Sequence, residues 1–207
     1  WDIKSTLSYY HNTQTVQQEG QIFPAGASTG AFPNGVIGEP EYNEDQARFD
    51  LHLAWNGWQD HIVRLGSGFF WGDIYKVTEH KNFDANLRPL PTGLTDVSDT
   101  SDVFLHENQR TNSYLYAQDE WRLQPQTVLT TGLRFDDYSD FGHTVNPRLA
   151  LVKAWQPNMT TRLLYSRAFH APSFIDLYAT NNPVAQGNPN LHPEILNNWE
   201  MGWSHQV

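Results

Sequence analysis

The sequence contains no cysteine, so disulfide bonds and thiolate–metal sites are excluded. It also has no apolar run close to eighteen residues, the length that a transmembrane helix needs. This absence does not exclude a transmembrane β-barrel, because barrel strands alternate apolar and polar residues and give only a weak hydropathy signal. Basic residues are scarce, with 13 Lys and Arg against 23 Asp and Glu, and the net charge of −10 argues against a nucleic-acid partner.

Recognisable catalytic and metal-binding motifs are missing as well. The 9 histidines are scattered without a close-spaced pair, and no H-E-x-x-H, G-x-S-x-G, phosphate-loop or dinucleotide-binding pattern occurs. Acidic neighbours occur at Asp119–Glu120 and Asp136–Asp137, but adjacent residues of a strand point to opposite faces, which is poor geometry for a shared site. We therefore predict a protein that is not an enzyme, with no metal site and no cofactor of its own.

A signal peptide is not recognisable in this stretch, which begins with Trp1 rather than Met. The chain ends at Val207, within a segment that has the pattern of a strand. We therefore expect both ends to be cut and the chain to be part of a longer protein.

Aromatic residues are abundant: 8 Trp, 9 Tyr and 11 Phe make up 14% of the chain. Such enrichment is typical of aromatic girdles at a membrane interface, of carbohydrate-binding β-proteins and of aromatic-rich soluble cores. Four tryptophans lie close to short predicted turns, where a girdle would place them: Trp55, Trp58, Trp121 and Trp155. Plain core packing would also account for them, so composition leaves these alternatives open.

Apolar and polar residues alternate in several segments, which is the pattern of β-strands with one apolar face. In the segment 47–55 the apolar face consists of Ala47, Phe49, Leu51, Leu53 and Trp55. The opposite face of the same segment carries Arg48, Asp50 and His52. A transmembrane barrel turns its apolar face to lipid, whereas a soluble sandwich turns it to a core, so alternation alone does not distinguish the two.

The lengths of the predicted connections favour the barrel. We predict about eight strands, at 1–18, 46–56, 60–80, 108–123, 127–138, 145–156, 160–169 and 197–207. Short connections at 56–60, 124–126 and 156–159 alternate with long polar ones at 19–45, 82–107 and 169–197, with one shorter exception at 139–144. Short turns at one rim and long loops at the other are typical of bacterial outer-membrane barrels, and a sandwich has no reason to sort its loops in this way.

Two segments closely resemble the TonB-dependent outer-membrane receptors: FDDYSDFGHTVNP at 135–147 and AFHAPSFIDLYATNNPVAQGNPNLHPE at 168–194. Within the second segment, the matching boxes are Phe169-His170-Ala171-Pro172-Ser173, Leu177-Tyr178 and Gly187-Asn188-Pro189-Asn190-Leu191-His192-Pro193-Glu194, followed by Glu200. Further matches lie upstream, at 75–79, 81–83, 116–121 and 132–134. The matches occur in the family's order from about Arg48 to Glu200, which makes the set far more specific than any single box.

The resemblance implies a fold, a location and a transport mechanism. Such receptors form a barrel of about 22 antiparallel strands, plugged by an N-terminal domain, in the bacterial outer membrane. They take up iron chelates, haem or cobalamin with energy passed through TonB. We therefore expect residues 1–207 to be an incomplete part of that barrel, with about eight strands, short periplasmic turns and long extracellular loops. No plug domain or TonB-contacting segment is recognisable, so TonB would act through an N-terminal part that is missing here.

The boxed loop supplies the candidate ligand-binding residues, which are His170, Tyr178, Asn190 and His192. The prolines of the boxes fix the backbone and should end the strand at 171–173, so the boxes mostly shape a loop. Haem receptors of the family carry an arginine where this chain has His170, and a histidine between the two boxes that this chain lacks. We therefore expect uptake of a siderophore-type iron chelate, with haem as the alternative ligand.

Two alternatives outside the family remain at this point. A soluble β-sandwich that binds carbohydrate through Trp and Tyr would turn its apolar faces inward, whereas a receptor wall would turn Phe49, Leu51, Leu133 and Leu149 to lipid. A passive porin would lack the boxes at 169–172 and 188–191.

Separated from the rest of its barrel, such a sheet would expose two unpaired edge strands and an apolar face. We therefore expect the chain to be stable only with its missing strands, with copies of itself or in detergent.

Overall fold

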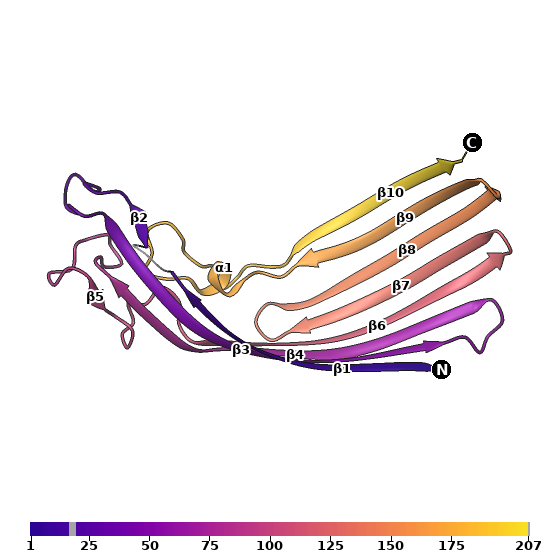
Figure 1. Ribbon diagram of the computed structural model, residues 1–207, viewed down its shortest axis with the longest axis horizontal. Helices are drawn as coiled ribbons and strands as arrows, with labels where there is room; N and C mark the ends of the chain where they lie inside the picture. Colours follow the sequence, from indigo (N-terminus) through magenta and orange to yellow (C-terminus); the bar gives the residue numbers. More distant parts are fainter. Residues whose placement is uncertain (17–19, 207) are drawn as a thin grey trace.

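The computed structural model describes residues 1–16 and 20–206, and within them the chain forms one open antiparallel sheet (Figure 1). Eight long strands follow one another, each paired with the next: β1 (Asp2–Thr15), β3 (Val36–Trp55), β4 (His61–Lys81), β6 (Asn108–Gln124), β7 (Thr127–Tyr138), β8 (Gly142–Gln156), β9 (Met159–His170) and β10 (Glu194–His205). The predicted all-β antiparallel architecture is therefore confirmed.

The long loops contain the remaining regular structure. The short strand β2 (Gln21–Phe23) pairs with β3, and β5 (Thr95–Asp96) pairs with β4. A single turn of helix, α1 (Phe174–Tyr178), lies between β9 and β10. No helix in the described ranges is long and apolar enough to cross a membrane.

The strand boundaries differ from prediction mainly at the end of the sheet that carries the long loops. The predicted loop 19–45 is wrong in its second half, because residues 36–45 continue β3. Residues 38–45 pair with β4, whereas Val36 and Ile37 pair with β2. This part of β3 is rich in Glu, Asn and Asp, so it has no apolar face to reveal it. Strand β10 likewise begins at Glu194, which pairs with His170, and not at 197. Residues 17, 18 and 207 of the predicted terminal strands lie outside the described residues.

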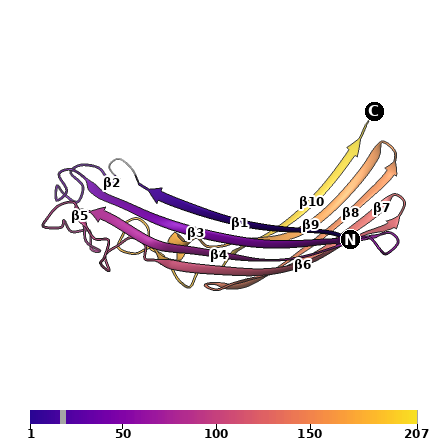
Figure 2. The same cartoon turned by 60° about the horizontal axis from the view of Figure 1, so that its bottom comes forward.

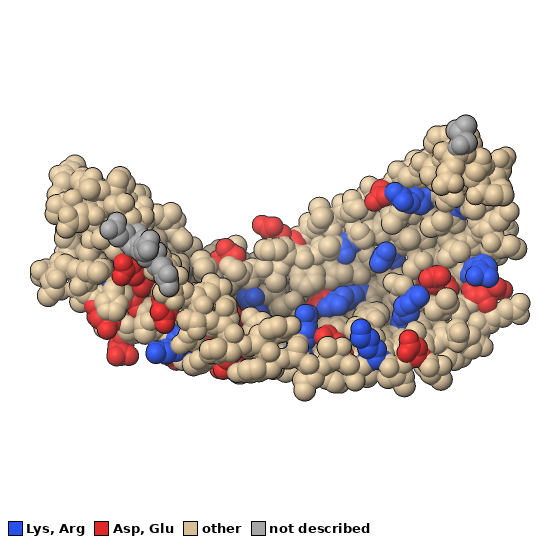
Figure 3. All heavy atoms as spheres, viewed as in Figure 1, with Lys and Arg blue, Asp and Glu red and all other residues tan. Residues whose placement is uncertain are grey.

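Figure 2 shows that the sheet is a single curved layer. Its two faces differ in chemistry. The register aligns apolar side chains across successive strands, so that Leu53 stands opposite Leu65, Leu65 opposite Ala117, and Ala117 opposite Leu133. Charged side chains gather on the hollowed face in Figure 3, and alternation therefore places the apolar side chains on the convex face. An uncovered apolar face over a whole sheet suits lipid and is unsuited to water.

The four residues predicted to face lipid all belong to this convex face. Phe49, Leu133 and Leu149 are 44%, 53% and 45% exposed, and Leu51 is half-buried among its neighbours. In a sandwich these side chains would be covered by a second sheet. The described chain forms one sheet only, so the sandwich alternative is wrong.

A band of aromatic rings follows the rim that carries the short turns. Trp1 stacks on Trp55 with a ring separation of 5.6 Å, and Trp55 meets Trp58 edge-on at 4.8 Å. His61 lies 6.0 Å from Trp58 and stacks on Trp121 at 5.2 Å. Rings with an apolar body and a polar N–H suit the interface between lipid and water. The band therefore marks the boundary of the apolar layer on the side of the short turns.

Strands β3 and β4 extend beyond the other strands at the opposite rim (Figure 1). A bulge at Tyr75 breaks the register between them and shifts the alternation of β4 by one residue. The concave face of β4 therefore carries Ile74 before the bulge, and Val77, Glu79 and Lys81 after it. This shift lets an extended hairpin bury a small core of its own above the membrane.

The loops close two small cores over this hairpin extension. The first core consists of Ile74, Val77, Val97, Val103 and Leu105, with Tyr42, Leu90, Phe104, Phe174 and Tyr178 packed against it. The second consists of Phe32, Val36 and Phe83, with Ile22, Phe23, Ala27 and Leu87 around it. The long loops are therefore folded structures and not loose connections.

Glycines on the concave face of β4 make room for tyrosine rings of β6. Gly68 stands opposite Tyr114, and a Cβ at Gly68 would lie 2.4 Å from Cε1 of that ring. The Tyr114 hydroxyl in turn donates to Oδ1 of Asp50 at 2.5 Å. The ring covers the glycine backbone in the manner of aromatic rescue of a glycine.

We expect Gly68→Ala to displace the Tyr114 ring and to lower the free energy of unfolding of the full-length protein by about 1–3 kcal/mol, the usual cost of overpacking. Gly132→Ala is the matched control, because a Cβ there would lie an ordinary 3.5 Å from Cγ of Gln118. Urea unfolding in lipid bilayers measures both changes. Equal losses for the two variants would contradict the packing argument.

Candidate functional site

Basic side chains lie along the concave face of the sheet (Figure 3). Strand alternation and register place an array of arginines on this face: Arg48, Arg64, Arg122, Arg134, Arg148 and Arg162. Arg64 lies 3.3 Å from Glu120, and Arg162 lies 3.4 Å from Glu200. Arg122 and Arg148 make no ion pair with any described residue. The face is therefore polar and supplies guanidinium groups that are available to an anion.

One arginine of the array is held by a continuous network. Arg134 donates two hydrogen bonds to the fully buried carboxylate of Asp136, at 2.8 and 2.7 Å. Its guanidinium lies 3.8 Å from the centre of the Tyr114 ring, which suits a cation–π contact. Tyr114 then reaches Asp50 across two strand pairs. The network joins β3, β6 and β7 into a rigid part of the wall.

A shallow hollow lies beside this network, over Gly132 on the concave face. Its volume is about 240 Å³, and Gln118, Arg134, Asn146 and Arg148 are among its lining residues. Asn146 donates to the Thr144 hydroxyl at 3.0 Å, while its own side-chain oxygen is buried without a partner in the described chain. Polar and cationic groups thus converge on one side of the sheet.

The boxed loop leaves the sheet at His170 and turns at once into α1. The prolines end the strand as predicted, since β9 stops directly before Ala171 and Pro172. Ser173 caps α1: its hydroxyl accepts from the Asp176 N–H at 3.1 Å, and the Asp176 carboxylate accepts from the Ser173 N–H at 2.8 Å. Hydrogen bonds from Ser173 lower the pKa of Asp176.

The boxed loop is tied to the loop 82–107 by backbone and side-chain hydrogen bonds. The Thr180 N–H donates to the Phe104 carbonyl at 2.8 Å. The Asn181 side-chain amide donates to the carbonyls of Ser101 and Val103 at 2.7 and 3.1 Å. Two loops that are far apart in sequence therefore form one folded unit above β3 and β4.

A buried pair of charges lies beneath this loop junction. Glu79 is 2% exposed and its carboxylate accepts from the Phe104 N–H, while the fully buried Lys81 donates to the Asp102 carbonyl. Burial raises the pKa of Glu79 and lowers the pKa of Lys81, and attraction between the two opposes both shifts. Both side chains satisfy loop backbone groups that would otherwise be buried without partners.

A second buried cation anchors α1 to the short β7–β8 hairpin. Arg110 is 8% exposed and donates from Nε to Oδ2 of Asp140 at 2.7 Å. Its guanidinium lies 5.1 Å from the centre of the Phe141 ring and 4.7 Å from that of Phe174. Because Phe174 opens α1, this cage fixes the start of the boxed loop.

The structure places the four predicted ligand-binding residues in different surroundings. His170 ends β9 and is exposed, and Asn190 and His192 are exposed near the end of the boxed loop. Tyr178 closes α1 and packs against the loop core beside Phe174. No hydrogen bond or ring contact joins any two of the four in the described chain. Tyr178 therefore has a packing role, and ligand contact by any of the four stays a prediction.

Sequence reasoning missed the residues that hold the loops together. In the sequence, Lys81 belongs only to a family match, and no motif distinguishes Arg110 or Asp140. The bulge at Tyr75 conceals the alternation that would place Lys81 on the side of β4 facing the loops. Arg110 lies in β6 and Asp140 in the β7–β8 turn, and their contact joins segments 30 residues apart, so no local pattern reveals it. No group of three or more potential His, Asp or Glu metal ligands occurs among the residues searched, which are the described ones.

The sequence model of the family "TonB dependent receptor-like, beta-barrel" matches residues 1–206. The chain therefore belongs to the β-barrel domain of the TonB-dependent receptors, which are bacterial outer-membrane proteins. The predicted family and location are confirmed. The curved open sheet is part of such a barrel wall, with its convex face toward lipid.

Curated relatives are receptors and transporters. The chain is 36% identical over 225 residues to the ferrienterobactin receptor of Escherichia coli, which covers 98% of this chain and 29% of the relative. It is 27% identical over 232 residues to a ferric enterobactin receptor of Pseudomonas aeruginosa, covering 99% of the chain and 29% of the relative. A vitamin B12 transporter of Photobacterium profundum is 26% identical over the whole chain and 34% of its own length.

Solved structures show the same fold. The siderophore receptor PirA from Acinetobacter baumannii superposes with a TM-score of 0.70 at 18% identity, over 99% of this chain and 30% of that one. The ferric enterobactin receptor PfeA, solved in complex with BCV-L6, gives a TM-score of 0.65 at 21% identity, over 100% and 31%. The chain thus spans about a third of the length of the proteins it resembles.

We expect Arg110→Met to release α1 from the β7–β8 hairpin in the full-length receptor. The change leaves the Asp140 carboxylate buried without its partner, which costs on the order of 3–5 kcal/mol. Hydrogen exchange should therefore become faster in residues 174–181. Arg88→Met removes an exposed arginine of loop 82–107 that has no ion pair in the described chain, and it should leave this exchange unchanged. Unaltered exchange in the Arg110 variant would contradict the anchor.

Proposed function

We propose that the protein containing this chain takes up an anionic, siderophore-type iron chelate across the outer membrane, with energy supplied through TonB. This chain would contribute part of the barrel wall, three long extracellular loops and the short extracellular β7–β8 turn. The observation that carries the proposal is the arginine array on the concave face of a chain that belongs to this receptor family.

Relatives of this chain support the ligand class. The Escherichia coli and Pseudomonas aeruginosa relatives are named as receptors for ferric enterobactin, an iron chelate of a siderophore. At 36% identity the Escherichia coli receptor shares more with this chain over nearly its full length than the vitamin B12 transporter does at 26%. A siderophore ligand is therefore favoured over a cobalamin.

Electrostatics on the concave face support an anionic ligand. Guanidinium groups present several donors in a fixed plane and remain charged at every physiological pH, which suits carboxylate and phenolate oxygens around a chelated metal. Arg148 is the best placed of the array, because it has no carboxylate partner in the described chain and lines the hollow over Gly132. An incoming anion would not first have to displace an internal partner.

Folded loops would supply the outer contacts. His170, Asn190 and His192 are exposed on the boxed loop, whose first half is fixed by Arg110 and by the junction with loop 82–107. A loop that is already ordered loses less conformational entropy when it binds. Contact with TonB is proposed for parts of the protein other than the residues described here.

The haem alternative rests on His170 and His192, because a neutral imidazole is a good iron ligand. Neither histidine is hydrogen-bonded to a second residue that would orient its ring for metal binding, in the part of the chain that the structure describes. We therefore rank haem below the siderophore chelate, and the experiment below distinguishes them.

The test is uptake by a bacterium that lacks its own receptors and expresses the full-length protein. Radiolabelled ferric enterobactin, haem and cobalamin are supplied separately, in strains with and without TonB. We expect TonB-dependent uptake of the ferric chelate only. Uptake of haem or of cobalamin alone, or uptake of the chelate without TonB, would contradict the proposal.

Arg148→Gln should raise the chelate concentration for half-maximal uptake about tenfold, because a hydrogen bond to a charged partner contributes roughly 1.5–3 kcal/mol. Lys153→Gln is the matched control, since it removes one positive charge from the same strand at a position that alternation places on the convex face. An equal effect of the two variants would indicate a response to net charge rather than a contact within the lumen.

A further inference from the structure

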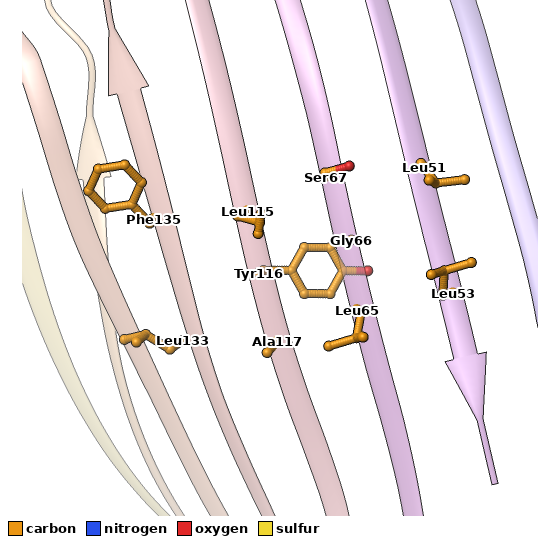
Figure 4. A pocket seen from close by; sticks show the side chains of 10 residues that line it. All are labelled: Leu51, Leu53, Leu65, Gly66, Ser67, Leu115, Tyr116, Ala117, Leu133 and Phe135. Atoms are coloured by element: carbon orange, nitrogen blue, oxygen red, sulfur yellow. The ribbon is translucent and has the colours of Figure 1, made fainter. Parts of the chain in front are cut away.

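The convex face has a hollow that the proposed function does not use (Figure 4). It measures about 410 Å³, and its lining comes from the four neighbouring strands β3, β4, β6 and β7. Leu51 and Leu53 lie at one side, and Leu133 and Phe135 lie at the other (Figure 4). The side chains that project into this space are almost all apolar.

The hollow exists because two small residues, Ser67 and Ala117, lie among large apolar side chains on the convex face. Ser67 of β4 stands between Leu51 and Leu115, which are its cross-strand neighbours on either side. One step nearer the periplasmic rim, Ala117 of β6 stands between Leu65 and Leu133. Ser67 and Ala117 are diagonal neighbours, so the two gaps join into one groove. Leucine at either position would fill its part of the groove.

The groove belongs to the interior of the sheet and not to an edge. Each of its four strands is hydrogen-bonded on both sides, since β1 flanks β3 and β8 flanks β7. Adding further barrel strands beyond β1 or β10 would therefore leave its walls unchanged. A second apolar hollow lies against β10 and lacks this independence, because its lining includes Trp199 and Met201 of the terminal strand.

The groove lies at a depth that lipid tails reach. On β6, Ala117 is four residues above Trp121 of the aromatic band, and on β4, Ser67 is six residues above His61. At about 3.3 Å per residue and a tilt near 45°, the two positions lie roughly 9 and 14 Å above the band. An outward apolar belt is about 25 Å tall, so the groove sits near the middle of the apolar layer.

We propose that this groove binds one acyl chain of a phospholipid from the periplasmic leaflet of the outer membrane. The chain enters past the aromatic band, where His61, Trp58 and Trp121 can meet the glycerol and head-group region. Its methylene groups then fill the space over Ser67 and Ala117, which would otherwise remain poorly packed.

Charge on the convex face selects this leaflet over the opposite one. Above the groove, Asp45 and Asp73 stand directly opposite each other on β3 and β4, and Asp137 lies at the same outer rim on β7. His11 pairs with Asp45 at 2.8 Å and Lys76 lies on the same face of β4, so acidic groups still outnumber the lysine there. These carboxylates disfavour the phosphates of lipopolysaccharide, the anionic lipid of the outer leaflet. At the periplasmic rim, Asp119 is already paired with His61 at 2.8 Å.

The experiment uses the full-length receptor in vesicles that contain phosphatidylethanolamine with a photoreactive diazirine in one acyl chain. After illumination, mass spectrometry maps the labelled residues. We expect label to concentrate on Leu65, Leu115 and Leu133, several-fold above an outward residue that lines no hollow, such as Leu7. Even labelling of all outward residues would overturn the proposal and indicate ordinary bulk lipid contact.

Two variants test the shape of the groove. Ser67→Leu combined with Ala117→Leu fills it and should lower the labelling at Leu115 several-fold. Ala47→Leu adds the same bulk to the same face outside the groove and should leave the labelling unchanged. Should the double variant fail to fold, judged by its mobility without boiling, Ser67→Leu alone carries the test. Unchanged labelling in the filled groove would overturn the proposal.

A competition arm identifies the source of the chain. Unlabelled lipopolysaccharide added to the vesicles should not reduce labelling at the groove, whereas unlabelled phosphatidylethanolamine should reduce it in proportion to its amount. Reduction by lipopolysaccharide alone would assign the groove to the outer-leaflet lipid and refute the assignment made here.

Discussion

Within a bilayer, every backbone N–H and C=O must find its hydrogen-bond partner inside the protein, because lipid offers none. The long strands of this chain meet that requirement by pairing each with the next over most of their length. Pairing fixes the register, and register fixes which face each side chain occupies. The apolar convex face, the arginine array on the concave face and the aromatic band at the rim all depend on this single constraint.

Outside the membrane, the extended strands β3 and β4 support the folded loops. Water can hydrogen-bond to backbone groups there, so the chain can form loops. A loop becomes ordered only where an apolar core offsets the loss of conformational entropy. The bulge at Tyr75 turns Val77 to the concave side of the β3–β4 hairpin, next to Ile74, and gives loop 82–107 a surface to pack on. Lys81 donates to the carbonyls of Asp102 and Asn181 and so joins the boxed loop to that unit, while Arg110 anchors the start of the boxed loop to the β7–β8 hairpin. Loops that are ordered before the ligand binds lose less conformational entropy on binding.

Sequence reasoning recovered the membrane half of the structure and missed much of the extracellular half. Alternation at 47–55 locates a strand because lipid demands an apolar face on every second residue. Residues 36–45 lie beyond the lipid, where Val36 and Tyr42 pack against the folded loops, so no strict alternation of apolar and polar residues is required there. Alternation therefore does not predict this part of β3, and its assignment to a loop is wrong. The boxes predicted where β9 ends, because proline acts locally. They did not reveal that Tyr178 packs into a core, or that Arg110 and Asp140 meet, since both facts depend on contacts between distant segments.

The central claim is that the two faces of this sheet meet different solvents. Single nitroxide labels at each position from 47 to 55 of the full-length receptor, in bilayers, test it directly through collisions with oxygen and with a water-soluble nickel complex. Labels at Phe49, Leu51 and Leu53 should favour oxygen, and labels at Arg48, Asp50 and His52 should not, giving a period of two residues. Uniform accessibility along the segment, or the opposite phase, would contradict the account.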